Sequence, residues 1–239
     1  MKFDVVIVGA GIAGLSCALT LQKKNLSCVV LESGDKPGGR IKTDIVDGFR
    51  LDHGFQVLQT GYPEAQRMLD LNDLQLKKFP AGVAVRYNGN FHIIADPRQH
   101  PRYILSTIGA PVGTVKDRII MLRLARSVCQ NTFEEIFTRP EERTIDFLQN
   151  MGFSEGFIKR FFVPFFAGAC LEQSITASSR IFQYIFRVFA AGDAALPAQG
   201  MGNIPGQLAA RLPKEAIRLN SRVVKVRDGK VVLSDDSEI

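Results

Sequence analysis

The chain has 239 residues, of which 46% are hydrophobic, so it is long enough and apolar enough to bury a real core. Thirty basic and 24 acidic residues leave a formal net charge of +6 without a dense run of lysine or arginine. This modest excess suits an anionic ligand or an acidic membrane surface. No recognised nucleic-acid module accompanies the charge, which argues against nucleic acid as a partner.

The four cysteines and three histidines indicate no metal site and no disulfide framework, because they show no C-x-x-C pair and no zinc-like spacing. Reduced thiols are typical of the cytoplasm. No run reaches the roughly 18 apolar residues of a membrane span. The apolar N-terminus contains Asp4 and lacks a cleavage site, which argues against a signal peptide. We therefore expect a cytoplasmic protein, with attachment to a membrane surface as an alternative.

The chain opens with a strand that runs directly into three glycines. The β-branched residues Val5 to Val8 precede Gly9, Gly11 and Gly14 in the spacing G-x-G-x-x-G, and a helical pattern continues over Ser16 to Lys24. In a parallel α/β unit the first glycine makes the turn, the second lets the backbone approach a pyrophosphate, and the third lets the helix pack on the strand. The free N–H groups of the helix start favour phosphate.

A second apolar strand, Leu26 to Leu31, ends at Glu32, which stands 18 residues after Gly14. A carboxylate at this place can accept hydrogen bonds from a ribose diol and would repel a 2′-phosphate. A glycine-rich turn can also be purely structural, and a strand-end glutamate can simply be solvated. Together, however, the two signals predict a dinucleotide-binding βαβ unit.

Two further clusters follow this unit. Pro37 to Arg40 reads Pro-Gly-Gly-Arg, which offers a backbone that can pass close to a ligand and an arginine that can bind phosphate; an ordinary turn is the alternative. Short strands are expected over Ile41 to Val46 and Phe49 to Leu51, around a turn at Asp47-Gly48. The cluster Asp52 to Gln56 then reads Asp-His-Gly-Phe-Gln.

As an ordered set, these motifs resemble the flavoprotein superfamily of amine oxidases, protoporphyrinogen oxidases and phytoene desaturases. The resemblance covers about the first 56 residues and implies FAD as the cofactor. It implies the following contacts: Gly9, Gly11, Ile12, Ala13 and Gly14 at the diphosphate, Glu32 and Ser33 at the adenosine ribose, Gly38, Gly39 and Arg40 at the ribityl and diphosphate side, and Gly54, Phe55 and Gln56 near the isoalloxazine ring.

No catalytic residue is assigned. His53 is a tempting base, but we favour a buried histidine that holds a loop. The resemblance implies an α/β fold in which a Rossmann-type, glutathione-reductase-like FAD-binding domain carries an inserted, mainly helical α+β substrate domain. The expected boundaries are residues 1–75 for the N-terminal part of the FAD-binding domain, 76–196 for the substrate domain, and 197–239 for the incomplete return to the FAD-binding domain.

The middle of the chain predicts one hairpin and several helices. Glu64 to Leu71 predicts a helix, and a hairpin turning at Asn88-Gly89 is expected from Val83 to Tyr87 and Phe91 to Ala95. Further helices are expected over Arg102 to Ile108, Val115 to Cys129, Thr144 to Met151 and Glu155 to Phe162, with Thr144 and Ser154 as N-caps and with Pro140 and Gly152 as stops.

Phenylalanine is concentrated in this region, since 12 of the 17 residues lie between Phe133 and Phe189. The core of a helical domain is the simpler explanation. The alternative is an apolar substrate tunnel or a face that dips into a bilayer. In that case the cations that could meet lipid phosphates are Lys159, Arg160, Arg180 and Arg187. Ile181 to Phe189 is apolar on nearly every side, so this helix is expected to be well covered.

Three features mark the C-terminal part. Ala191-Gly192-Asp193 is similar to the flavin motif that the superfamily has near its C-terminus, but here it follows a helix, so we interpret Gly192 as a helix end. Pro197 to Pro205 resembles the family's Pro-x-Gly-Gly-Met segment, with Gln199 in place of the first glycine of the pair. Three short strands are then expected over Ile217 to Leu219, Arg222 to Val226 and Lys230 to Leu233.

The resemblance places Val223 at the adenine. Proteins of the superfamily usually continue for a long further stretch, so we expect this chain to be the N-terminal part of such an enzyme: a fragment, a truncated product or one half of a split protein. A complementary C-terminal chain is therefore an expected partner, beside a small and apolar substrate.

The leading hypothesis is an FAD-dependent oxidoreductase that takes a hydride from a C–H bond of an apolar or amine substrate. One alternative is a non-catalytic or split flavin- or nucleotide-binding fragment that needs a C-terminal half. The second alternative is an NAD-dependent dehydrogenase, which accounts for Gly9 to Glu32 but leaves Gly38 to Arg40 and Gly54 to Gln56 unexplained.

Overall fold

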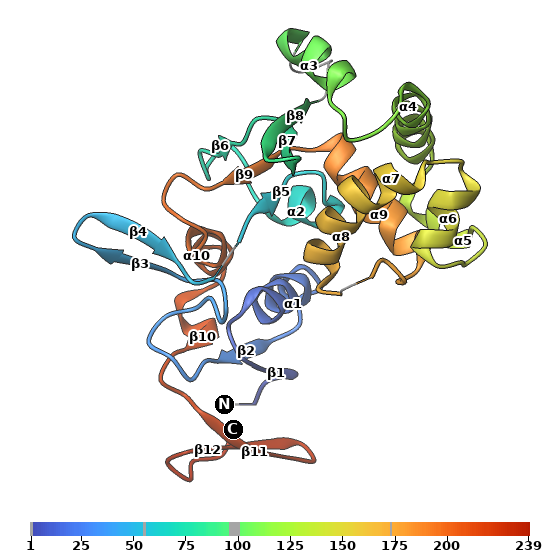
Figure 1. The fold of residues 1–239 in the computed structure, drawn as a ribbon. Coiled ribbons are helices and arrows are strands. Elements are labelled where there is room, and N and C mark those ends of the chain that lie inside the picture. Colours follow the sequence, from blue (N-terminus) through green and yellow to red (C-terminus); the bar gives the residue numbers. More distant parts are fainter. Residues whose placement is uncertain (1, 55, 96–100, 173) are drawn as a thin grey trace. The chain divides into compact units, whose positions relative to one another are not determined.

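A computed structural model describes residues 2–54, 56–95, 101–172 and 174–239, which form two compact units (Figure 1). Unit 1 comprises Met1–Leu58, Pro63–Lys78 and Ala195–Ile239, and unit 2 comprises Gln59–Tyr62 and Phe79–Ala194. Each unit has its own hydrophobic core. Two assignments stay predictions: that residues 1–75 and 197–239 bind a cofactor, and that residues 76–196 bind a substrate.

Unit 1 is built on a parallel sheet in the order β1-β2-β10. Strand β1 (Val5–Val8) pairs with β2 (Cys28–Leu31), and β10 (Ile217–Arg218) adds to the other edge of β2. Helix α1 (Ile12–Lys23) connects β1 to β2 and buries its apolar side against Ile7 and Val30. The predicted α/β arrangement of strand, glycine turn, helix and strand is therefore confirmed.

Short elements complete unit 1. Hairpin β3 (Thr43–Val46) and β4 (Phe49–Asp52) turns at the predicted residues, where Asp47 and Gly48 both have positive φ. The other elements are α2 (Pro63–Met68), β6 (Lys77–Lys78), α10 (Asn203–Ala210), η3 (Lys214–Ala216), β11 (Val223–Arg227) and β12 (Lys230–Leu233), while β5 (Leu58–Gln59) and β9 (Ala194–Leu196) each have one residue in unit 2. Helix α2 is shorter than predicted, because the Asp70 carboxylate accepts from Asn72 N–H and Asp73 N–H and forms a turn instead.

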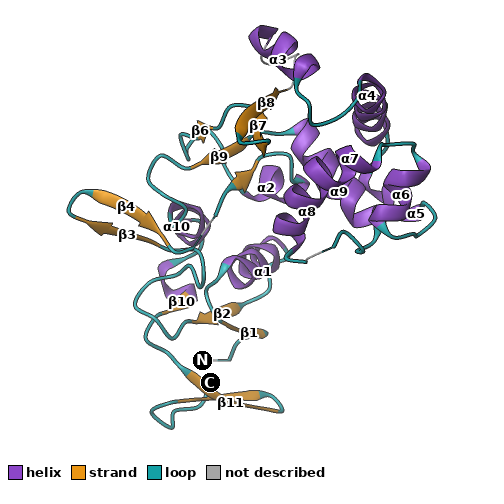
Figure 2. Ribbon diagram, in the orientation of Figure 1, coloured by secondary structure: helices purple, strands orange, loops and turns teal. Residues whose placement is uncertain are grey.

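Unit 2 is mainly helical, as Figure 2 shows, with one hairpin formed by β7 (Gly82–Tyr87) and β8 (Asn90–Ala95). The hairpin turns at Asn88-Gly89, as predicted. The helical elements are η1 (Pro101–Tyr103), α3 (Ile104–Gly109), α4 (Val115–Gln130), α5 (Phe133–Thr138), α6 (Thr144–Asn150), α7 (Glu155–Phe157), the π-helix η2 (Ile158–Phe162), α8 (Val163–Cys170) and α9 (Ser179–Ala191).

The phenylalanines form much of the core of unit 2. Phe162 and Phe166 of the η2–α8 segment are fully or almost fully buried, and both rings contact Phe182 of α9, with centroids 5.7 and 4.6 Å apart. The simpler explanation of the phenylalanine-rich region is therefore supported. Helix α9 is less covered than predicted, since Ile181 and Phe189 are 40% and 36% exposed on its outer side.

Three helix boundaries test the predicted caps and stops. Ser154 caps α7 as predicted, because its hydroxyl accepts from Phe157 N–H. The prediction for Thr144 was wrong: Arg143 is the N-cap, and the Thr144 hydroxyl donates to the Ala177 carbonyl at 2.8 Å. Gly192 ends α9 as predicted.

A buried carboxylate links two helix starts in unit 2. Asp117 of α4 is fully buried, and its oxygens accept from the N–H and hydroxyl of both Thr114 and Ser154, at 2.7 Å in each case. Burial alone would raise the pKa of the Asp117 carboxyl, but the N–H and hydroxyl donors of Ser154 and Thr114 outweigh burial and lower it. This aspartate therefore holds the N-termini of α4 and α7 together as an ion.

Candidate cofactor-binding site

The turn between β1 and α1 requires glycine at two of its positions. Gly9 has a φ of +96°, which side chains rarely permit. A Cβ atom on Gly14 would lie 2.0 Å from the Gly9 carbonyl oxygen, so the helix could not approach the strand this closely with any other residue. The first and third glycines of the motif therefore fix the path from strand into helix.

The N-terminus of α1 is open to an anion. Its N-cap is Gly11, which has no side chain to accept from the first turn, and that turn contains no acidic residue. The N–H groups of Ile12, Ala13 and Gly14 belong to this first turn, where an α-helix leaves its donors without helical partners. The helix dipole favours negative charge here, so a diphosphate fits the chemistry of this end.

The Gly38-Gly39 segment lies directly against this turn. The Gly38 N–H donates to the Ala10 carbonyl at 2.9 Å, and Gly11 and Gly38 form a parallel bridge. A Cβ atom on Gly39, whose φ is +59°, would lie 3.3 Å from the Gly11 Cα. We call these paired segments, residues 9–14 and 38–39, the glycine cradle. Because the cradle residues Gly11 and Gly39 have no side chains, a ligand can approach their backbone atoms.

Glu32 stands at the end of β2 and holds the cradle from the other side. Its carboxylate accepts from Ala10 N–H and Gly34 N–H, each at 2.8 Å, and from the Ser33 hydroxyl at 3.2 Å. Burial by itself would raise the pKa of the Glu32 carboxyl, but these donors, aided by Lys42, lower it. The carboxylate is therefore ionised at neutral pH. Glu32 Oε2 accepts only from Ala10 N–H among these donors, so it has a further lone pair that a ribose hydroxyl could use.

The Asp-His-Gly-Phe-Gln cluster is connected to the Arg40 segment by a side chain. Gln56 Nε2 donates to the Arg40 carbonyl at 3.0 Å and to the His53 carbonyl at 2.6 Å. Gly54 has a φ of +75°, and Phe55 lies outside the described residues. The Arg40 side chain is exposed and makes no hydrogen bond or ion pair within the described part of the chain, so it is free to bind phosphate.

The prediction of a buried His53 was wrong. Its side chain is about half exposed, and Nε2 lies 2.7 Å from the Asp44 carboxylate of β3. Lys36 Nζ is 3.5 Å from the same carboxylate. The hydrogen bond from His53 is the main reason that the pKa of Asp44 is lowered. His53 comes directly after β4 at the open end of the β3–β4 hairpin, and this position leaves it in solvent.

A second polar network joins the hairpin to the segment before α10. The Thr43 hydroxyl bonds to the Asp52 carboxylate, the Met201 N–H donates to Asp52 at 2.9 Å, and the Gly202 N–H donates to the Thr43 hydroxyl at 2.8 Å. The motifs in the sequence include Asp52, but the hydrogen bonds of Thr43 and Asp52 were not predicted. The hairpin register could have indicated them, since it places Thr43 opposite Asp52.

A separate contact joins Gln199, which stands in place of a glycine of the family's segment, to Arg50 of β4. Its side-chain oxygen accepts from Arg50 Nε at 3.1 Å and from Arg50 Nη2 at 2.6 Å. Gly200 is the residue that cannot change, because its φ is +89° and a Cβ atom would lie 2.5 Å from the Thr43 side chain. Val223 packs with Val29 and Leu31 of β2 and with Leu233. Its contact with an adenine stays a prediction.

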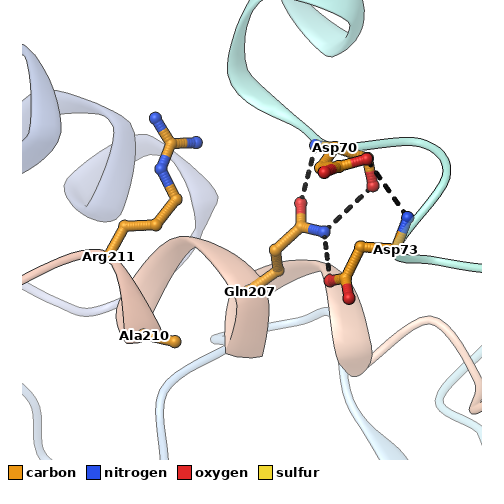
Figure 3. Close-up of a pocket in the computed structure, with 5 residues that line it drawn as sticks. All are labelled: Asp70, Asp73, Gln207, Ala210 and Arg211. Carbon is orange, nitrogen blue, oxygen red and sulfur yellow. Dashed lines mark hydrogen bonds between the residues drawn. The ribbon is translucent and has the colours of Figure 1, made fainter.

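Two cavities lie in unit 1 outside the cradle residues. One, of about 440 Å³, is lined by Asp70, Asp73, Gln207, Ala210 and Arg211 (Figure 3). In this cavity Gln207 Nε2 donates to Asp73 at 2.7 Å and to the Asp70 carbonyl at 3.0 Å. The other, of about 250 Å³, lies beside Lys36, Lys42 and Thr43. Neither cavity is lined by the glycines of the cradle. We nevertheless place the candidate site on the cradle, because its backbone fits a diphosphate.

The described residues contain no group of three or more histidine, cysteine, aspartate or glutamate side chains that could hold a metal ion. In the same residues no helix is both long and apolar enough to cross a membrane. The parallel sheet, the glycine cradle and Glu32 together define an α/β protein of the dinucleotide-binding class.

The chain belongs to the flavin-containing amine oxidoreductase family, whose sequence profile matches residues 12–239. It is 28% identical to polyamine oxidase 2 of Arabidopsis thaliana over 152 residues, which cover 60% of this chain and 31% of that protein. It is 32% identical to the chloroplastic/mitochondrial protoporphyrinogen oxidase 2 of the same plant over 84 residues, which cover 35% of this chain and 16% of that protein. The family consists of FAD-binding oxidoreductases, which confirms the resemblance seen in the motifs.

The solved structure of putrescine oxidase bound to putrescine has the same fold, with a TM-score of 0.64 and 22% identity. The match covers 100% of this chain and 56% of that one. The chain thus spans little more than half the length of this solved oxidase, and about a third or less of each of the two curated relatives is aligned.

Proposed function

We propose that this chain is an FAD-binding oxidoreductase that takes a hydride from a C–H bond of an amine or apolar substrate. The observation that carries the proposal is the glycine cradle, where the open N-terminus of α1 lies against Gly38 and Gly39 beside the ionised Glu32. Membership of a family of FAD-dependent oxidoreductases supports the same reading. Unit 2 would be the inserted, mainly helical α+β substrate domain of a glutathione-reductase-like fold.

Each residue of the cradle has a binding or orienting role in this proposal. The N–H groups of Ile12 to Gly14 and the Arg40 guanidinium would hold the diphosphate. Glu32 would accept from the ribose diol while Ala10 and Gly34 keep its carboxylate in place. Gly54 and Gln56 would present backbone at the isoalloxazine ring. When bound, FAD supplies the hydride acceptor, and the chain orients the substrate and excludes water.

The proposed substrate is apolar or an amine for two reasons. One relative is named a polyamine oxidase, which favours an amine, and another is named a protoporphyrinogen oxidase, which favours a larger apolar molecule.

Titration of the purified chain with FAD, followed by its visible spectrum, tests the cofactor. We expect a yellow protein whose bound FAD survives gel filtration, and a preparation that stays colourless with excess FAD contradicts the proposal. A parallel titration with NAD distinguishes the dehydrogenase alternative, which requires that NAD bind more tightly than FAD. We expect the reverse, because Gly38 to Arg40 add contacts that an NAD site does not need.

Anaerobic addition of a polyamine or of a protoporphyrinogen tests turnover, because hydride transfer bleaches the flavin absorbance. Bleaching by either compound supports the full proposal. Tight FAD binding without bleaching by any substrate supports the alternative of a non-catalytic or split module that needs a complementary chain, for which the 56% span of putrescine oxidase is the supporting observation.

A further inference from the structure

Two helices of unit 2 leave large apolar side chains in solvent. On α3, Leu105 and Ile108 are 84% and 54% exposed, and on α4 Leu122 is 62% exposed. We define the α3–α4 surface by its exposed apolar residues, which are Ile104, Leu105, Ile108, Val115, Ile119 and Leu122. Figure 1 labels both helices. Surface helices of soluble proteins normally place polar residues on this side.

Helix α4 carries two separate apolar stripes. Its inner stripe, Ile120, Leu124 and Val128, is buried in the core of unit 2. Its outer stripe, Val115, Ile119 and Leu122, follows the spacing i, i+4, i+7 and is exposed. Because the inner stripe already attaches α4 to the core, the outer stripe contributes little to folding and is available for another contact.

The two helices are held together by one arginine. Arg118 of α4 donates through Nε to the Thr107 carbonyl and through Nη2 to the Ala110 carbonyl, both at 2.7 Å. These carbonyls lie in α3 and at its C-cap, where a helix leaves its acceptors without helical partners. The arginine thereby fixes α3 to α4, so the exposed residues of both helices belong to one structural piece.

All of the exposed charge in this segment is positive. Between residues 101 and 131 the basic residues outside the Arg118 contact are Arg102, Lys116, Arg123 and Arg126, and all four are exposed. The one acidic residue in that range, Asp117, is fully buried and bonded to Thr114 and Ser154. These cations form no ion pair with the described residues, and apolar side chains beside such cations are the combination that an anionic lipid surface attracts.

The cations that the sequence suggested for lipid contact are otherwise engaged. They contact a glutamate, aromatic rings or a backbone carbonyl within unit 2, and they are Lys159, Arg160, Arg180 and Arg187. A lipid-facing role for these four therefore has less support than one for the α3–α4 surface.

We propose that the α3–α4 surface docks on an anionic lipid bilayer. Leu105 and Leu122 enter the boundary between headgroups and acyl chains, and Lys116 and Arg123, which are both exposed, meet the lipid phosphates. The helices lie on the membrane, since no helix among the described residues could span it. This attachment is independent of the proposed FAD site, which is in unit 1.

Vesicle sedimentation of the full chain tests the proposal. The probes are vesicles of phosphatidylcholine alone and of phosphatidylcholine with about 30% phosphatidylserine at low salt. We expect the chain to pellet with the phosphatidylserine vesicles and to be released at high salt, because screening weakens the cation contacts. The double variant Leu105→Glu/Leu122→Glu should bind at least about tenfold more weakly.

The matched control is Val224→Glu/Val226→Glu, which places the same two charges on exposed apolar residues of unit 1. It should bind vesicles like the unchanged chain, and circular dichroism checks that all variants stay folded. Equal loss of vesicle binding in the control and in Leu105→Glu/Leu122→Glu would overturn the proposal, as would a chain that stays in solution with both vesicles. Sedimentation velocity identifies the competing result: a dimer that Leu105→Glu/Leu122→Glu converts to a monomer, without vesicle binding, assigns the surface to self-association.

Discussion

At the scale of single residues, carboxylates organise both units by accepting from backbone N–H groups. Glu32 bonds to the turn after β1, and Asp117 bonds to two helix starts. The sequence predicted Glu32 as a ligand-binding residue from its spacing, but it could not predict the bond to Ala10, because a side chain's backbone partner depends on how the loops pack. The prediction that His53 is buried was wrong for the same reason, since the burial of a side chain also depends on how the loops pack.

Replacing Glu32 with glutamine should weaken FAD binding about tenfold, since the amide keeps one acceptor oxygen but lacks the charge that strengthens a bond to the ribose hydroxyls. The measurement is a fluorescence titration with FAD. The control is Glu64→Gln on α2, where the glutamate only pairs with Arg67 on the surface, and FAD affinity should stay unchanged. Equal affinities for all three proteins would remove Glu32 from the proposed site.

Replacing Asp117 with alanine should lower the free energy of unfolding of unit 2 by about 3 kcal/mol, because buried donors of Thr114 and Ser154 lose their acceptor. Urea unfolding monitored by circular dichroism measures the change. The control Asp146→Ala removes an exposed carboxylate that pairs with Arg143, and it should cost less than about 1 kcal/mol.

The same aspartate should make stability depend on pH. Its pKa is lowered on folding, so the unfolded state binds more protons and stability rises with pH. The contribution of Asp117 is fully present above its unfolded pKa of 3.8 and is lost as pH falls through the lower, folded value. Urea midpoints between pH 2 and pH 6 should therefore fall less steeply on acidification in Asp117→Asn than in the unchanged chain. Parallel curves would contradict this assignment.

At the scale of elements, prediction succeeded where one local signal sufficed. The Asp47-Gly48 and Asn88-Gly89 turns and the long periodic helix α4 all form where the sequence places them. The predicted extents of two other helices were wrong. Helix α2 ends early at the Asp70 turn, and the predicted helix over Glu155 to Phe162 changes to a π-helix at Ile158.

Substitution of glycine by alanine should have opposite effects on the stability of unit 1 at two positions, one at the contact between β1 and α1 and one in α10. Gly14→Ala should cost unit 1 at least about 3 kcal/mol, because its Cβ atom would lie 2.0 Å from a backbone oxygen. Gly206→Ala in α10 meets nothing within 4 Å and should stabilise the unit by up to about 1 kcal/mol. Thermal unfolding followed by circular dichroism measures both, and similar melting temperatures for the two variants would refute the close packing of α1 on β1.

At the scale of the whole molecule, the sequence of unit 2 is inserted between segments of the sequence of unit 1, and each unit buries its own core. The shift from α/β to helical patterning along the sequence predicts such a division. The sequence predicted each glycine motif of the cradle but not that the two motifs lie side by side. The hydrogen bond from Gly38 to Ala10 joins segments that are distant in sequence. Hydrophobic periodicity describes one segment at a time and does not predict which distant segments contact each other.

Because each unit has its own core, a substitution in the core of unit 2 should leave the ligand binding of unit 1 nearly unchanged. Asp117→Ala should lower the unfolding transition of unit 2 while the FAD affinity of unit 1 stays within about twofold of the unchanged chain. Calorimetry with and without FAD distinguishes the two transitions. A single transition that shifts as a whole in the variant would show that the two cores unfold together.

The bond between Gly38 and Ala10 has a thermodynamic consequence for the folded chain. The cradle exists only when residues 9–14 and 38–39 are side by side, so the unfolded chain offers no equivalent surface for a diphosphate. A ligand held there acts as a reversible cross-link, and at a hundredfold excess over its dissociation constant it stabilises the folded state by about 2.7 kcal/mol. Cofactor supply would thus set how long unit 1 survives unfolding and proteolysis.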